Sequence, residues 1–131
     1  MLSIQKKFLF IHIPKTVGNS IHNFLKHYSE DKIVFFNPWQ DDVEIFEVRN
    51  KNFSHIHKHS SLLDHYQVLS PDVFHSLYKF AVIRNLWERM IYYFFSPHSQ
   101  TQKWNRDEFI NLLRKARTIF YYLNSHGLPS S

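Results

Sequence analysis

The residues from Pro14 to Ser20 are of the types that bind anions. The run combines one lysine, one glycine and three side chains with hydroxyl or amide groups, in the order Pro14, Lys15, Thr16, Val17, Gly18, Asn19 and Ser20. If a helix begins here, its unpaired backbone N–H groups, the positive end of its dipole and a mobile lysine meet at one place. This run is therefore a candidate site for a phosphate or a similar anion.

A second chemical feature is a set of three histidines within five residues, His55, His57 and His59. An imidazole titrates near neutral pH, so it can accept a proton from a reacting hydroxyl group. In an extended chain the three rings would share one face, as zinc ligands can, but no cysteine and no clear acidic partner accompany them. We therefore expect proton transfer and no metal. A further histidine, His12, is expected to be buried in a strand and hydrogen-bonded.

The hydrophobic pattern around the anion-binding run predicts a strand before it and a helix after it. Phe8–Ile11 and Ile13 are apolar, as in a buried strand. The predicted helix has one apolar face, formed by Ile21, Phe24, Leu25 and Tyr28. A Walker A loop has its lysine after the last glycine, whereas Lys15 precedes Gly18, which disfavours an ordinary ATPase loop.

The same strand, turn and helix layout recurs in the segment from Tyr78 to Phe95. Phe80–Ile83 is an apolar run typical of a strand covered on both faces, and Arg84 follows at its carboxyl end. Ligands of open α/β sheets bind at that edge. Because a guanidinium can bind a phosphate through two parallel hydrogen bonds, Arg84 is a second candidate anion ligand.

Together the two segments resemble the sulfotransferases that use 3′-phosphoadenosine 5′-phosphosulfate (PAPS), especially the carbohydrate branch. The 5′-phosphosulfate loop of that family resembles Ile-Pro-Lys-Thr-Gly-Gly-Thr-Ser, which here reads Ile13-Pro-Lys-Thr-Val-Gly-Asn-Ser20. Its 3′-phosphate element resembles Phe-Val-Arg-Asn-Pro-Tyr-Glu-Arg-Leu-Leu-Ser-x-Tyr, which this chain follows at Arg84, Asn85, Glu88 and Arg89. Lys58-His59-Ser60-Ser61 is similar to a Lys-His-Ala-Thr-like segment of the family. The resemblance spans about residues 8–115.

The resemblance implies transfer of a sulfuryl group from PAPS to a hydroxyl acceptor, by family branch a carbohydrate, with no metal required. Lys15 and His59 would be the catalytic residues: Lys15 neutralises charge on the bridging phosphate oxygen, and His59 accepts the proton. The run from Pro14 to Ser20 would hold the 5′-phosphate, and Arg84 the 3′-phosphate. Tyr92 stands where the family has a serine that shares the 3′-phosphate.

The expected fold is a single α/β domain over residues 1–131, a three-layer α/β/α arrangement with a mainly parallel central sheet. The resemblance makes it a P-loop NTPase-like sulfotransferase fold in a short or truncated form. Further strands are predicted at Ile33–Phe36 and Val43–Val48, and a short helix after Ser70. A helix capped by Asn105 and Glu108 should continue over 118–123, and it carries Phe109, Leu112, Leu113 and Ala116 on one side. The aromatic runs at 92–95 and 120–122 are expected to pack in the core.

Composition agrees with an anionic ligand, since the formal net charge is +5 and the pI is near 9.5. The lysines and arginines are scattered, without an arginine-rich arm, so nucleic acid is not the expected partner. The absence of cysteine excludes disulfides and thiolate metal sites. With no leader pattern and no apolar run near the roughly 20 residues that span a bilayer, a cytoplasmic protein without membrane contact is expected.

Three functions from different classes stay open: an active sulfotransferase, a domain that binds PAPS or its bisphosphate product without turnover, and an unrelated nucleotide or nucleic-acid binder. Val17 in place of a glycine and Tyr92 in place of a serine favour binding without turnover. The unrelated binder would show no preference for a 3′-phosphate. Because family members continue past this length, a second subunit is one way to complete the site.

Overall fold

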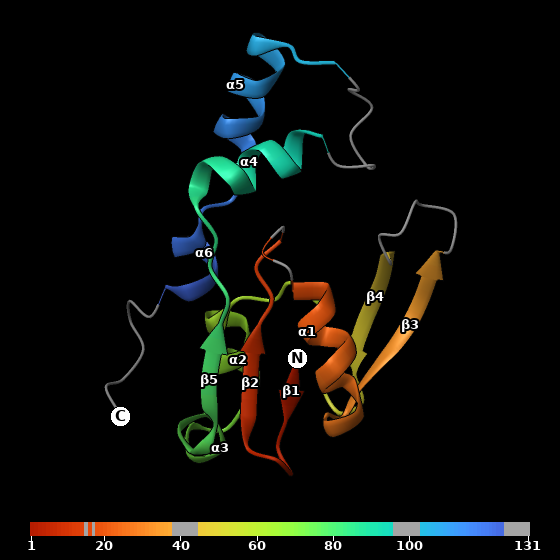
Figure 1. Ribbon diagram of the computed structural model, residues 1–131. Helices are drawn as coiled ribbons and strands as arrows, with labels where there is room; N and C mark the ends of the chain where they lie inside the picture. The colour runs from red at the N-terminus through yellow and green to blue at the C-terminus, as the bar shows by residue number, and fades with distance from the viewer. Residues whose placement is uncertain (15, 17, 38–44, 96–102, 125–131) are drawn as a thin grey trace.

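Strand β2 (Phe8–Ile11) lies between two partners in a small mixed sheet, β1 (Leu2–Ser3) and β5 (Tyr78–Ala81). The computed structural model describes residues 1–14, 16, 18–37, 45–95 and 103–124 of this mixed α/β protein (Figure 1). β5 runs parallel to β2, and β1 runs antiparallel to it. The expected mainly parallel sheet is thus mixed, because the chain turns back after Ser3 to form the neighbouring strand.

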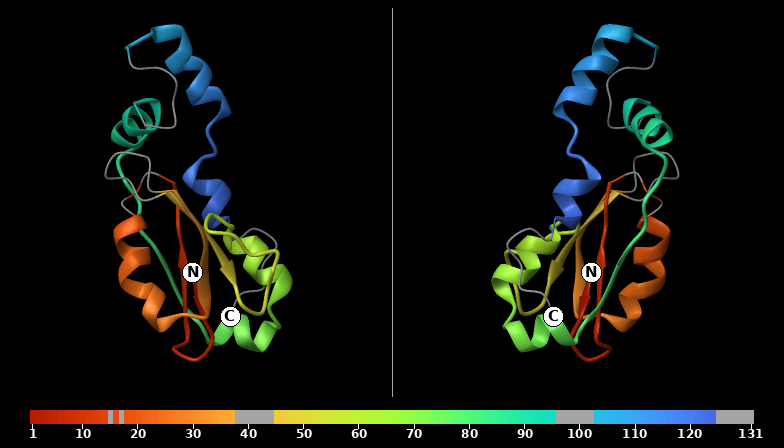
Figure 2. Two further views of the ribbon diagram at one scale, coloured as in Figure 1. Left: turned by 90° about the vertical axis from the view of Figure 1, so that its right-hand side faces the viewer. Right: turned by 90° about the vertical axis from the view of Figure 1, so that its left-hand side faces the viewer.

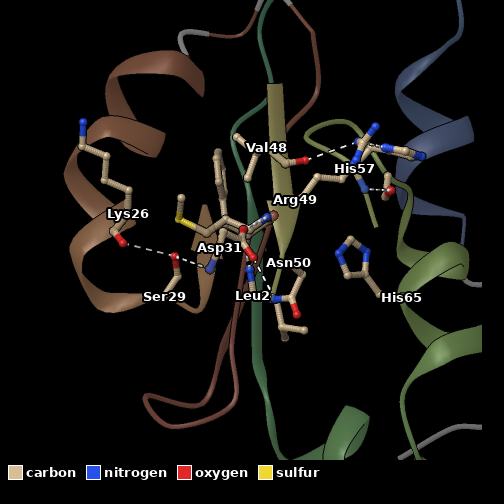
Figure 3. Close-up of polar contacts among 12 residues, drawn as sticks. Leu2, Lys26, Ser29, Asp31, Val48, Arg49, Asn50, His57 and His65 are labelled. Carbon is tan, nitrogen blue, oxygen red and sulfur yellow. Dashed lines mark hydrogen bonds and ion pairs between the residues drawn. The ribbon is translucent and has the colours of Figure 1, made fainter. Parts of the chain in front are cut away.

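A second, antiparallel ribbon is formed by β3 (Asp31–Asn37) and β4 (Ile45–Asn50), which confirms a strand in each of the two predicted segments. Val43 and Glu44 of the second predicted strand lie outside the described residues. The Asp31 carboxylate ties this ribbon to the sheet. It accepts hydrogen bonds from the Leu2 backbone N–H at 3.2 Å and from Asn50 Nδ2 at 2.8 Å (Figure 3). The ribbon is therefore anchored at the end where β3 begins.

Helices cover both faces of the sheet (Figure 2). On one face lie α1 (Gly18–Leu25) and the short 3₁₀ helix η1 (Lys26–Tyr28); on the other lie α2 (Leu62–Val68), α3 (Pro71–Ser76) and α6 (Ile119–Leu123). Side chains alternate along a strand, so every second apolar side chain of β2 and of the residues after it points to the face covered by α2, α3 and α6. The core there comprises Leu2, Leu9, Ile11, Ile13, Leu69, Phe74, Leu77 and Tyr122.

Beyond the carboxyl end of the sheet lie α4 (Leu86–Phe94) and α5 (Arg106–Lys115), which share a smaller apolar cluster of Met90, Phe94 and Phe109 (Figure 1). The Asn105 side chain accepts hydrogen bonds from the first turn of α5, and the predicted apolar side of this helix packs on that cluster. The predicted continuation over 118–123 is wrong, because α5 ends at Lys115 and the Thr118 hydroxyl caps a separate helix.

The predicted apolar face of α1 is also wrong in part. Phe24 and Tyr28 are 69% and 52% exposed, whereas His22 is buried. At about 100° per residue, Phe24 lies roughly 200° around the helix from His22, on the far side from the sheet. Tyr28 falls in the tighter 3₁₀ turn, which has a different period.

The aromatic runs are only partly buried. Phe94 and Tyr122 lie in the two apolar clusters, whereas Tyr92, Phe95 and Phe120 are exposed. A helix turns only one side to its neighbours, so consecutive rings cannot all be buried. In the described part of the chain, no helix combines the length and apolar character needed to cross a bilayer.

Candidate anion-binding site

The two candidate phosphate-binding segments leave the sheet at the same edge. β2 and β5 are parallel neighbours, and Ile11 lies opposite Ala81 in the register. The residues that follow these two therefore start level with each other at the carboxyl ends of the strands (Figure 1). This is the edge at which open α/β sheets bind ligands.

The loop after β2 leads directly into the first turn of α1. Gly18 is the first residue of that helix, and Ser20, in the same turn, is exposed. Lys15 and Val17 lie outside the described residues, and Asn19 follows Gly18 in the helix. The first N–H groups of an α-helix have no partner within it, so the end of α1 that faces the loop can receive an anion.

Thr16 is placed differently from the other polar residues of the loop. Its side chain is buried, and its hydroxyl donates a hydrogen bond to the Ile13 carbonyl at 2.7 Å. The hydroxyl therefore closes the turn of the loop itself. Thr16 was predicted to contact a ligand, but its side chain instead supports the shape of the loop.

Arg84 lies three residues past the end of β5, since the strand ends at Ala81 and not at Ile83 as predicted. Its Nε pairs with the Glu88 carboxylate at 3.3 Å, and its guanidinium lies 4.0 Å from the centre of the Tyr92 ring. Hydrogen bonding to Tyr92, followed by Glu88, raises the pKa of Arg84 above its usual range. Tyr92 thus contacts the arginine directly, and the guanidinium is held in a defined place.

The segment that carries Arg84 is fixed by the start of α4. Asn85 accepts hydrogen bonds from the N–H groups of Trp87 and Glu88 at 3.0 and 3.4 Å, which caps the helix. Arg84 therefore sits immediately before a capped helix end.

One residue of the site was not assigned a role from the sequence. Arg89 is buried, and its side chain reaches from α4 to the carbonyl of Pro14 in the loop after β2, at 2.9 Å from its Nε. Its Nη1 donates to the carbonyl of Arg117 at 3.2 Å. Burial lowers the pKa of Arg89, and the nearby Tyr122 and Tyr93 oppose that shift. The only signal in the sequence was its match to the family's second motif.

Of the three clustered histidines, His59 lies against the end of β2. Its Nδ1 is 2.7 Å from the His12 carbonyl, and the two rings are 4.6 Å apart. A carbonyl can only accept, so Nδ1 carries a proton, and in the neutral imidazole the lone pair is then on Nε2. His55 and His57 are exposed, and His57 contacts Arg49 (Figure 3).

Two buried histidines lie next to His59. The His12 ring is 6.0 Å from that of His22 on α1. Burial, followed by the nearby His59 and Lys58, holds the pKa of His12 far below its usual range, and burial lowers that of His22 to about 3. The expectation that His12 is fully hydrogen-bonded is wrong for Nδ1, which is buried without a partner in the described part of the chain. The rings of His12 and His22 are therefore neutral at pH 7.

No three His, Asp or Glu side chains among the described residues gather closely enough to hold an ion. The rings of His55, His57 and His59 do not share a face, because the segment turns instead of extending.

Comparison with known proteins finds no matching family model and no curated protein or solved structure with significant similarity to this chain.

Proposed function

We propose that this chain is a PAPS-dependent sulfotransferase with the fold of that family, which transfers a sulfuryl group to a carbohydrate hydroxyl. The observation that carries the proposal is the pairing of β2 with β5. Because of this pairing, the loop at Pro14 and the segment that carries Arg84 both begin at the same edge of the sheet. A nucleotide with phosphates at both 5′ and 3′ positions needs two such anion sites, and ATP needs no second one.

The 5′-phosphosulfate is assigned to the loop between β2 and α1. The helix N-terminus supplies backbone N–H groups and a favourable dipole, and Lys15 would neutralise the charge that builds on the bridging oxygen. Thr16 holds the loop closed through its bond to Ile13. The turn of the loop is thus fixed by a hydrogen bond within it.

The 3′-phosphate is assigned to Arg84. This guanidinium is partly exposed and is oriented by Glu88 and Tyr92. An arginine held in this way can form two parallel hydrogen bonds with a phosphate while its side chain loses little freedom.

In the proposed reaction the acceptor oxygen attacks sulfur, in line with the bond from sulfur to the 5′-phosphate oxygen. The new S–O bond forms as that bond breaks, and adenosine 3′,5′-bisphosphate leaves. The hydroxyl proton goes to His59, whose bond to the His12 carbonyl places the accepting lone pair on Nε2.

Calorimetric titration with adenosine 3′,5′-bisphosphate and with 5′-AMP tests the binding part of the proposal. The wild-type protein should bind the bisphosphate more tightly, Lys15→Ala should weaken both ligands, and Arg84→Ala should remove the preference. Equal binding, or no binding, of the two nucleotides by folded protein would contradict it.

A domain that binds PAPS without turnover is the second candidate, favoured by Tyr92, whose ring occupies the space beside Arg84. Both candidates predict the same binding. Release of the bisphosphate from PAPS in the presence of a panel of sugar acceptors separates them, because only the enzyme consumes PAPS.

A further inference from the structure

The guanidinium of Arg89 joins three segments that are far apart in the sequence. From α4 it reaches the carbonyl of Pro14, 75 residues earlier, and that of Arg117, 28 residues later. Only 1% of this residue is exposed. Burying a cation against neutral carbonyls is costly, and an apolar side chain of similar size would fill the space with a smaller penalty.

The bond to Pro14 falls at the point where the loop begins. Pro14 directly precedes Lys15, and α1 starts at Gly18. The backbone of the loop is therefore held at one end by Arg89 and at the other by the helix. The bond from Thr16 to Ile13 closes the turn around Pro14.

We propose that Arg89 is a positioning residue that fixes the loop in the shape that receives a 5′-phosphate. The inference rests on the proposed nucleotide site and adds a residue that does not touch the ligand. In the described part of the chain no carboxylate forms an ion pair with Arg89, so its positive charge also favours an anion at this edge of the sheet.

The role predicts a pattern of affinities that differs from that of Arg84. Arg89→Met should weaken adenosine 3′,5′-bisphosphate and 5′-AMP in parallel, by about tenfold or more, because two buried hydrogen bonds to a charged group are lost. Both ligands carry the 5′-phosphate, so the ratio of their affinities should stay as in the wild type. Arg84→Ala should change that ratio. Arg89→Lys, which keeps the charge, should lose less affinity for both nucleotides than Arg89→Met does.

Arg114→Met is the matched control, since Arg114 is an exposed arginine on α5. It should leave both affinities unchanged. A selective loss of bisphosphate binding in Arg89→Met would overturn the proposal, because Arg89 would then act through Arg84. Unchanged affinities would overturn it as well.

Amide hydrogen exchange of residues 12–20 gives a readout that needs no nucleotide. Exchange there should be faster in Arg89→Lys and Arg89→Met than in the control. If the wild type binds neither nucleotide, the proposed function fails, and this measurement still decides whether Arg89 holds the loop. If Arg89→Met does not fold, the lysine variant decides: exchange equal to that of the wild type would overturn the proposal.

Discussion

The guanidinium of Arg84 lies between the Glu88 carboxylate and the face of the Tyr92 ring, 4.0 Å from its centre. Such a contact contributes about 0.5–1 kcal/mol at an exposed site. Tyr92→Ala should therefore weaken adenosine 3′,5′-bisphosphate by about two- to fivefold and leave 5′-AMP unchanged, whereas Tyr92→Phe keeps the ring and most of the affinity. Calorimetry measures both. Tighter binding by Tyr92→Ala would mean that the ring occupies the place of the phosphate.

His59 is the second residue whose surroundings make a distinct prediction. His59→Asn keeps a donor near the position of Nδ1 for the His12 carbonyl but has no base at Nε2. Bisphosphate affinity should stay within about twofold, while release of the bisphosphate from PAPS should fall by about 100-fold or more. His57→Asn, at an exposed position, is the control. A full rate in the His59 variant would remove this histidine from the mechanism.

At the residue scale, a contact is open to prediction from the sequence only where it is local. Arg84 lies just before α4 and contacts Glu88 and Tyr92 on that helix, so the three residues are close together in the sequence. The contact of Arg89 with Pro14 bridges 75 residues and depends on how β2 and β5 pair. No local pattern encodes such a contact.

At the scale of elements, α2 begins at a capping box formed by Ser61, two residues after His59. The Ser61 hydroxyl accepts from the Asp64 N–H at 3.1 Å, and the Asp64 carboxylate accepts from the Ser61 N–H at 2.7 Å. Ser61→Ala should lower the free energy of unfolding by about 1 kcal/mol, measured by urea denaturation. Gln67→Ala, exposed on the same helix, should change it by less than about 0.5 kcal/mol. Equal changes in the free energy of unfolding for the two variants would show that the Ser61 cap does not stabilise the protein.

The same scale shows which elements the sequence could predict. The strand at Phe8–Ile11 and the helices after Ser70 and Asn105 are confirmed, because apolar runs and capping residues act within a few positions. β1 was missed, since a strand of two residues has no period of its own. The prediction for the buried face of α1 was wrong because packing against the sheet buries His22 and leaves Phe24 exposed.

For the whole molecule, buried histidines predict that stability depends on pH. Burial lowers the pKa of His65 to about 4, and its Nδ1 lies 2.7 Å from the Ser61 carbonyl. In the unfolded chain the usual value is about 6.5, so the unfolded state takes up the proton first as the pH falls. The contribution of neutral His65 to the free energy of unfolding is complete above about pH 6.5 and is lost progressively down to about pH 4. The difference corresponds to about 3 kcal/mol at most.

His65→Asn tests this dependence, because asparagine can donate to the same carbonyl but does not titrate. Urea denaturation at several pH values between 7 and 4 should give a flatter stability curve for this variant than for the wild type. His27→Asn, at an exposed position of η1, should leave the slope unchanged. Equal slopes in His65→Asn and the wild type would show that His65 is not the group responsible.

The nucleotide site is tested most directly by mapping, with ¹H–¹⁵N NMR, which backbone amides shift when adenosine 3′,5′-bisphosphate is added. The largest shifts should fall in two groups, at residues 12–20 in the loop after β2 and the first turn of α1, and at residues 82–89 after β5. With 5′-AMP the first group should still shift while the second shifts much less. Shifts confined to other parts of the chain, or no shifts at all, would contradict a sulfotransferase-like site at this edge of the sheet.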